Sequence, residues 1–460
     1  MAADASTAVQ AFANLLKCMV GSGILTLPYV TAKVGLGISL PGLAIIAYLT
    51  QEAIRFVVRC AAQERSHSQY VDLDKSGSDG GADGMHGSLS WNLVSKAAFG
   101  RAGNAFTLIC LVGAQLGVVA SYLNFVGNTF MLYMPGLTVL QSRVGLWVVV
   151  TLLCLLRPLK SVAFVSGLAL AVYAVIFVLI GYYGATAAPR SADSPALNLF
   201  SPAYFGAWFG PAIFAFEGAG PALSIYESMG TTDVRPFFRV LTSTYSIAVL
   251  LYGFVAAAGY ISWGERCVRC RRAAALRIPF ASARRISCTF HLFDSARGPS
   301  SAAEFHLRHA RSVTSVVIDS FPPTFLGSGS RCILAIILAM TYPIQVAPVF
   351  QLVESTMTLR RPALRAMWPV TRALVVGFTA FASFLIPDME KLVALTGGVF
   401  FSLLGFCLPG IFYLRLRPPA DDHGARSSGA SQAQEVALAI AIVTLGVVGG
   451  VFSVYAELFR

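Results

Sequence analysis

Charged side chains are scarce in this 460-residue chain: Asp, Glu, Lys and Arg make up 12% of the residues, against 56% that are hydrophobic. So little charge does not suit one ordinary water-soluble core. Long apolar runs recur at the length that a membrane helix requires, whereas the weakly alternating strands of an outer-membrane barrel are missing. The sequence therefore predicts an all-α polytopic membrane protein.

Other absences narrow the function. The chain has no phosphate-binding loop, no paired aspartates and no metal-spaced ligands in its apolar runs. Its nine cysteines are scattered, and the one CxxC motif, Cys267 to Cys270, has no second pair at zinc-site spacing. The net charge of +12 comes without a folded basic face or clustered aromatics. We expect no enzyme, no metal site, no cofactor and no nucleic-acid partner.

Eleven apolar stretches are long enough to cross about 30 Å of hydrocarbon. Because eleven is odd, the two termini are predicted to lie on opposite sides. The stretches lie near residues 12–32, 37–59, 104–133, 143–157, 161–184, 204–227, 238–263, 327–356, 367–387, 391–414 and 435–457.

Lysine and arginine predict the orientation, since cytoplasmic loops carry an excess of them. With the N-terminus inside, the cytoplasmic segments hold 17 of these residues and the opposite side holds 6, leaving out residues 266–312. We therefore expect a multi-pass protein in the lipid bilayer with a cytoplasmic N-terminus. The plasma membrane and a vacuolar or lysosomal membrane both fit.

Two segments differ from the apolar stretches. Residues 63–100, rich in Ser, Gly and Asp at their centre, are predicted to be a cytoplasmic linker. Residues 266–312 hold ten Arg and two acidic residues, so they contribute 10 − 2 = +8 of the net charge. This segment is either a disordered insertion or, because its basic residues are all Arg, a gene-model artefact.

The first apolar stretch carries Gly21, Ser22 and Gly23 at its centre and Pro28 soon after, and Gly and Pro weaken helices. An unpaired backbone N–H or C=O in hydrocarbon costs several kcal/mol, so a break is tolerated only inside protein or beside a watery cavity. The free N–H groups that start the following half-helix suit a carboxylate. Close packing through small residues is the alternative explanation.

The sixth stretch has a similar interruption at Glu217, Gly218, Gly220 and Pro221. A charged residue at the bilayer centre costs about 2.5–3.5 kcal/mol on insertion scales, so Glu217 favours a functional role. Breaks in the first and sixth stretches correspond if stretches one to five and six to ten are inverted repeats. Such paired breaks indicate the midplane binding site of a transporter.

Four segments resemble the first, sixth, eighth and tenth helices of the eukaryotic amino acid/auxin permease family, above all its proton-coupled and vesicular or vacuolar branch. The resemblance implies a five-plus-five inverted-repeat fold shared with leucine-type transporters. Residues 1–415 would form the transporter core, with repeats at about 12–184 and 204–414, and residues 435–457 an additional helix. The segments are "NLLKCMVGSGILTLPY", "FEGAGPALSIYESM", "TYPIQVAPVFQLVE" and "LTGGVFFSLLGFCLPGIFYL".

The resemblance also implies an α-amino acid held between the first and sixth helices. Amides of the first break would hold its carboxylate, and carbonyls of the second would meet its ammonium group. The matching positions are Gly21, Ser22, Gly23 and Ile24 in the first helix and Phe216, Glu217, Gly218 and Gly220 in the sixth.

The resemblance and the residues together predict a secondary active transporter of small neutral amino acids. All six histidines fall in predicted loops, so Glu217 is the first choice for proton coupling. Thr341 in the eighth helix is a candidate cation ligand, which keeps Na⁺ open as the coupling ion beside H⁺. The remaining alternative is an amino acid sensor with the same fold and no transport.

Overall fold

The computed structural model describes residues 7–73, 86–134, 136–155, 162–186, 199–231, 233–263, 316, 318, 325–360, 367–418 and 429–459. All regular structure within these ranges is helical, which confirms the predicted fold class. The Arg-rich segment 266–312 lies outside the described residues.

Within the described ranges, seven helical spans are long and apolar enough to cross a membrane, and the bent pair at the N-terminus makes an eighth. The apolar stretches of α5 (Val139–Leu155) and of residues 167–183 in α6 (Val162–Thr186) are shorter. The count of eleven crossings stays a prediction. The long spans belong to the following helices: α3 (Leu36–Leu73), α4 (His86–Tyr133), α9 (Arg235–Trp263), α12 (Phe325–Arg360), α13 (Trp368–Leu385), the run from α14 (Met389–Thr396) to α15 (Leu408–Leu416), and α16 (Gly429–Phe459).

Both predicted breaks are present. The first apolar stretch consists of α1 (Ala8–Met19), the 3₁₀ turn η1 (Ser22–Thr26) and α2 (Leu27–Val34), with a bend of 44°. The sixth consists of α7 (Phe205–Ala215) and α8 (Ala219–Ser228). The chain leaves helical geometry at the glycines, as the sequence predicts.

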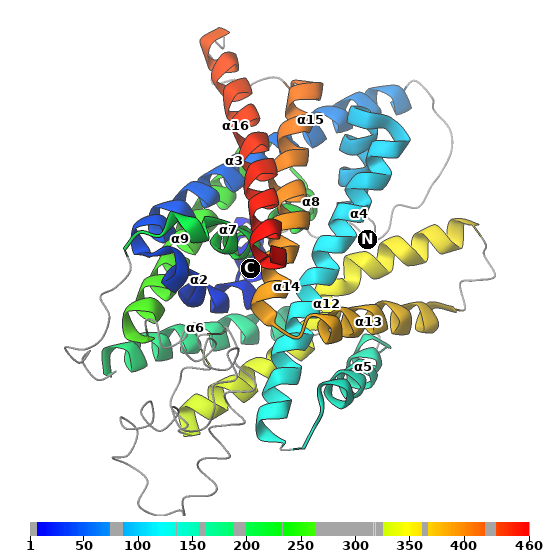
Figure 1. Cartoon of the computed structure of the whole chain (residues 1–460). Helices are drawn as coiled ribbons and strands as arrows, with labels where there is room; N and C mark the ends of the chain where they lie inside the picture. The colour runs from blue at the N-terminus through cyan, green and yellow to red at the C-terminus, as the bar shows by residue number, and fades with distance from the viewer. Residues whose placement is uncertain are drawn as a thin grey trace, which may run out of the picture.

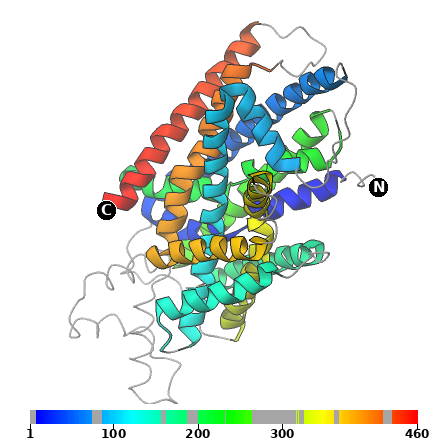
Figure 2. The ribbon, with the colours of Figure 1, turned by 90° about the vertical axis from the view of Figure 1, so that its right-hand side faces the viewer.

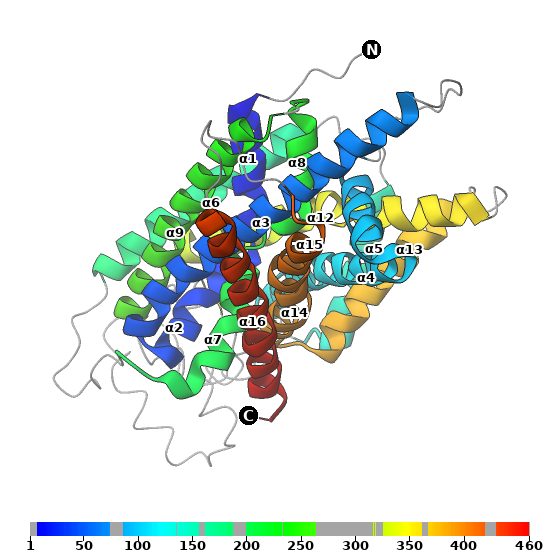
Figure 3. The ribbon, with the colours of Figure 1, turned by 90° about the horizontal axis from the view of Figure 1, so that it is seen from above.

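The helices fall into two packed groups. α1, α2 and α3 pack on α9, with α8 against α1 and α3, while α4, α5, α12 and α13 pack on one another. Seen from above, α1, α2 and α9 of the first group lie to the left of α4, α5 and α13 of the second group (Figure 3). α6 contacts both α9 and α12. The two groups meet at the broken helices, since α4 also packs on α8 and η1.

A buried arginine ties the second group together. Arg143 in α5 is 2% exposed and donates to the side-chain oxygens of Asn124 at 3.1 Å and Asn128 at 2.9 Å. Asn124 in turn donates to the carbonyl of Ile386, just after α13. These contacts join α4, α5 and α13 without an acidic partner for Arg143 among the described residues.

The last two apolar stretches pack side by side. An eleven-residue π-helix, η7 (Gly397–Cys407), interrupts the run from α14 (Met389–Thr396) to α15 (Leu408–Leu416). No pattern in the sequence predicted this π-helix. The additional helix α16 lies along α15 and η7 and also packs on α7, as Figures 1 and 2 show.

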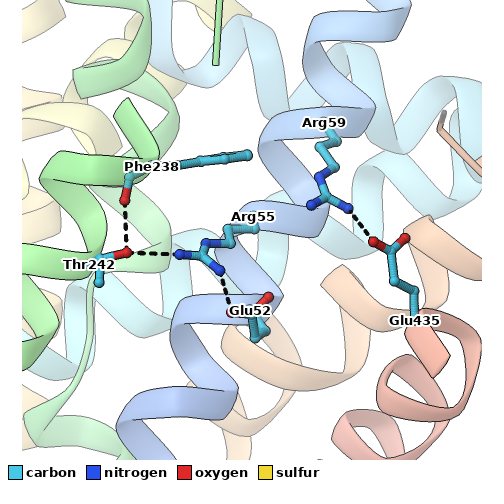
Figure 4. A network of polar contacts seen from close by, with 6 residues as sticks. All are labelled: Glu52, Arg55, Arg59, Phe238, Thr242 and Glu435. Atoms are coloured by element: carbon cyan, nitrogen blue, oxygen red, sulfur yellow. Dashed lines mark hydrogen bonds and ion pairs between the residues drawn. The ribbon is translucent and has the colours of Figure 1, made fainter. Parts of the chain in front are cut away.

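Charged residues of α3 fasten it to α9 and α16 (Figure 4). Arg55 donates to Glu52 at 2.6 Å and to the hydroxyl of Thr242 in α9 at 2.8 Å. Arg59 pairs with Glu435 in α16 at 3.0 Å. The pairing of Glu52 with Arg55 one helical turn apart follows from their spacing, whereas the contact with α16 does not.

The predicted linker 63–100 is helical wherever it is described. Residues 63–73 continue α3, and residues 86–100 begin α4. Residues 63–73 contain neither Gly nor Pro, whereas the Ser- and Gly-rich run begins at Lys75. Helix-compatible residues before that run therefore extend α3, and the cytoplasmic linker at 63–100 stays a prediction.

Close backbone packing in η7 gives the first testable prediction. A Cβ atom at Gly397 would lie 2.0 Å from the carbonyl oxygen of Gly210 in α7, whereas one at Gly405 would have no neighbour within 4 Å. We expect Gly397→Ala to destabilise the fold by about 1–3 kcal/mol through overpacking. Thermal unfolding of the purified protein should show a lower midpoint for this variant and an almost unchanged one for Gly405→Ala. Equal midpoints for the two variants would contradict the packing described.

Candidate functional site

A cavity of about 220 Å³ lies beside both breaks, with walls from α1, α4, α6, α8 and α12. Polar side chains and a lysine share the walls with aliphatic residues. The residues that line the cavity include Lys17, Trp91, Gln115, Tyr122, Gly220 and Thr341.

The cavity lies on the side of the breaks that faces the N-terminus. Lys17 and Cys18, which precede the first break, line it. On the far side of the breaks, Lys33 at the end of α2 forms an ion pair with Glu390 of α14, which is fully buried. The described cavity thus lies on the near side of the breaks, and an ion pair joins α2 to α14 on the far side.

In the first break, Ser22, Gly23 and Ile24 are buried and do not line the cavity, whereas Val20 does line it. The hydroxyls of Ser22 and Ser121 in α4 lie 2.7 Å apart. A Cβ atom at Gly23 would lie 2.6 Å from Cδ1 of Phe214 in α7, and one at Gly21 would lie 3.3 Å from the Tyr122 hydroxyl. Gly23 thus serves the contact between the two broken helices, while Gly21 faces a cavity residue.

The predicted Ile24 is also buried, at 1% exposure. Gly21, by contrast, is only partly buried. The contribution of the first break to the cavity comes through the end of α1.

The carbonyls of the second break already have protein donors. The Phe216 carbonyl accepts from the Tyr245 hydroxyl at 3.2 Å, and the Gly218 carbonyl accepts from the Ala222 amide at 3.1 Å. The Gly220 carbonyl, at the cavity wall, accepts from Nε1 of Trp91 at 3.4 Å. An ammonium group at this break would have to share or replace these donors.

Glu217 is 6% exposed and belongs to a hydrogen-bond chain that crosses three helices. Its Oε1 accepts from Nε2 of Gln115 at 3.2 Å, and Oε1 of Gln115 accepts from Nε2 of Gln345 at 3.0 Å. Gln115 and Gln345 both line the cavity. The carboxyl group is thus connected to the cavity through an amide.

Titratable side chains from three elements face Glu217. They are Cys18 of α1, Tyr122 of α4 and, from α9, Tyr245 and Tyr252. In free solution at neutral pH, all four of these side chains are mainly in their neutral, protonated form.

Two tyrosines of α9 serve the ends of both broken helices. The Tyr252 hydroxyl donates to the carbonyl of Met19, the last residue of α1, at 2.8 Å. The Tyr245 hydroxyl donates to the carbonyl of Phe216, which follows α7. Seven residues are two helical turns, so both hydroxyls lie on one face of α9. Neither tyrosine is predicted from the sequence as a site residue. The signal for them was the spacing of two tyrosines by two helical turns within an apolar span.

The candidate cation ligand Thr341 does line the cavity. Its hydroxyl donates to the Leu338 carbonyl of its own helix at 3.1 Å. The neighbouring Tyr342 points elsewhere, to the hydroxyl of Thr379 at 2.6 Å. The structure thus brings Thr341 to the same cavity as Gly220, and Glu217 to its border.

The family model described as transmembrane amino acid transporter protein matches residues 4–268 and 309–458. The chain belongs to this family. The resemblance drawn from the four sequence segments is therefore confirmed. The gap in the match falls inside the Arg-rich segment 266–312.

Relatives from Arabidopsis thaliana agree with the family match. Amino acid transporter AVT3A is 25% identical over 89% of this chain and 82% of its own length, and amino acid transporter ANT1 is 21% identical over 91% and 86%. These relatives are named as transporters, so this family member is not an enzyme.

The fold is that of the leucine-type transporters. The crystal structure of MhsT in complex with L-phenylalanine is similar with a TM-score of 0.52, although the two chains share only 13% identity. The match covers 97% of this chain and 98% of MhsT. The predicted five-plus-five architecture is therefore confirmed at the level of the fold.

The tyrosines of α9 give the second prediction. Tyr252→Phe removes the donor to the buried Met19 carbonyl, and an unsatisfied buried group costs about 1–3 kcal/mol. Tyr173 is the matched control, because its buried hydroxyl has no hydrogen-bond partner among the residues that the structure describes. Thermal unfolding should show a lower midpoint for Tyr252→Phe than for Tyr173→Phe. The reverse order would mean that the hydroxyl of Tyr252 does not stabilise the end of α1.

Proposed function

We propose that the protein is a secondary active transporter that carries small neutral amino acids across a membrane and couples their movement to protons. The observation that supports this most is the cavity beside two broken helices, bordered by the buried carboxyl group of Glu217. Free peptide groups at such breaks suit the carboxylate and ammonium groups of an amino acid.

The size and chemistry of the cavity favour a small neutral side chain. Its volume of about 220 Å³ is below the roughly 300–1,000 Å³ of drug-sized ligand sites. Leu111, Ile337 and Ile344 supply apolar wall, while Lys17 supplies a positive charge. This charge disfavours a cationic side chain.

Proton coupling through Glu217 rests on its place between the two helix groups. The carboxyl group belongs to the broken sixth helix, and its partner Gln115 belongs to α4 in the other group. A change in its protonation alters a contact that crosses between them. Rocking of one group against the other is the expected mode of alternating access.

Flux into proteoliposomes tests the function. Uptake of labelled alanine and other small neutral amino acids should exceed that of lysine and should rise when a proton gradient is imposed, in sodium-free buffer. Uptake that depends on sodium and not on pH would identify Na⁺ rather than H⁺ as the coupling ion, with Thr341 as a candidate ligand. Binding without flux would favour the sensor.

Glu217→Gln gives the third prediction. The amide resembles the protonated acid in shape but cannot release a proton, so uptake should lose its dependence on the proton gradient. Glu354→Gln is the control, since Glu354 pairs with Arg372 at 2.9 Å away from the cavity. Its uptake should keep the wild-type pH profile. An unchanged profile in Glu217→Gln would remove Glu217 from the coupling.

A further inference from the structure

The short helix before the bend in α4 covers one wall of the cavity. We define residues 91–99 as the gate segment. Trp91 is 1% exposed, lines the cavity and donates its Nε1 hydrogen to the Gly220 carbonyl of α8 at 3.4 Å. Its indole thus connects the helix group of α4 with the broken sixth helix.

The gate segment lies on the side of the membrane that carries the N-terminus. The first broken helix crosses and α3 returns, so the beginning of α4 lies on the side where α1 begins. The cavity lies on this same side of the breaks, as Lys17 and Cys18 show. The gate segment is therefore placed between the cavity and the N-terminal side.

A glycine bend joins the gate segment to the spanning part of α4. Gly100 has φ 66° and ψ −154°, a combination that is essentially restricted to glycine. A Cβ atom there would meet nothing within 4 Å, so the backbone angles rather than space require glycine. The bend leaves room for the segment to change its angle.

One hydrogen bond spans the bend. The Ser95 hydroxyl donates to Oδ1 of Asn104 at 2.7 Å, with Ser95 before the bend and Asn104 after it. This contact holds the segment at its present angle.

The gate segment also rests on α15. The ring of Phe412 lies 6.4 Å from that of Trp91 and 6.0 Å from that of Phe99. The Arg415 guanidinium lies 5.2 Å above the Phe99 ring. The segment is thus held by aromatic packing on α15 and by the indole hydrogen bond to α8.

We propose that residues 91–99 gate the cavity on the N-terminal side, with Trp91 as the residue that holds the gate to the sixth helix. Rotation at Gly100 withdraws the indole and opens the cavity. The Gly220 carbonyl is also one of those expected to meet the substrate ammonium group. A bound amino acid competes with Trp91 for it, which links filling of the cavity to release of the gate.

The gate proposal rests on the proposed transport function in one respect only, which is the identity of the molecule that passes the gate. Its test reads the thiol of Cys18, which lines the cavity. A charged, membrane-impermeant maleimide is applied to the full-length protein in nanodiscs without substrate. The rate of Cys18 modification is measured by peptide mass spectrometry, and Cys18→Ala identifies the signal.

Trp91→Phe keeps an aromatic ring but removes the N–H donor. We expect Cys18 to react at least about five-fold faster in this variant, as the loss of one hydrogen bond predicts. Trp147→Phe is the matched control, since Nε1 of Trp147 donates to the Ala373 carbonyl at 2.9 Å away from the cavity. It should react at the wild-type rate.

Asn104→Ala provides a second route to the same result. It removes the bond across the bend without touching the cavity wall, and it should also accelerate the reaction of Cys18. The gate is refuted if both Trp91→Phe and Asn104→Ala react at the wild-type rate, or if Trp147→Phe is accelerated as much as Trp91→Phe.

Added alanine separates the gate from the function. Altered Cys18 reactivity of the wild-type protein with millimolar alanine supports binding in the cavity. No effect of alanine together with acceleration in Trp91→Phe would retain the gate and count against the proposed substrate. An effect of alanine without acceleration in Trp91→Phe and Asn104→Ala would retain the function and reject the gate.

Discussion

A backbone polar group cannot remain unpaired in hydrocarbon, and this constraint governs the centre of the molecule. Two spans leave helical geometry at the depth where water is absent, so each freed group must find a partner in the protein or in a polar cavity. Tyr245 and Tyr252 satisfy carbonyls at the two breaks. The cavity beside them has largely apolar walls that carry a few polar groups, among them Gln115 and Lys17.

The sequence predicted the breaks because Gly and Pro act locally on the helix in which they lie. It also marked Glu217, because an acid within an apolar span is conspicuous. It did not reveal Gln115, Trp91 or Tyr252, whose roles depend on partners far away along the chain. The position of Gly23 against Phe214 likewise follows only from the packing of two separate helices.

Contacts that cross between the two helix groups are few and polar at the cavity. Ser22 meets Ser121, Glu217 meets Gln115, and the Gly220 carbonyl meets Trp91. Within the second group, by contrast, buried Arg143 ties α4 to α5. Rigid groups joined by a few exchangeable hydrogen bonds suit a cycle in which one group rocks against the other. The ion pair of Lys33 with Glu390 joins α2 to α14 on the far side of the breaks.

The central claim is that a small amino acid occupies the space between the two helix breaks. A structure of the purified protein determined by electron cryo-microscopy with saturating alanine tests it most directly. The account predicts density for one small molecule in the cavity between the end of α1 and Gly220. Density at another place, or continuous helices through residues 19–24 and 215–219, would contradict it.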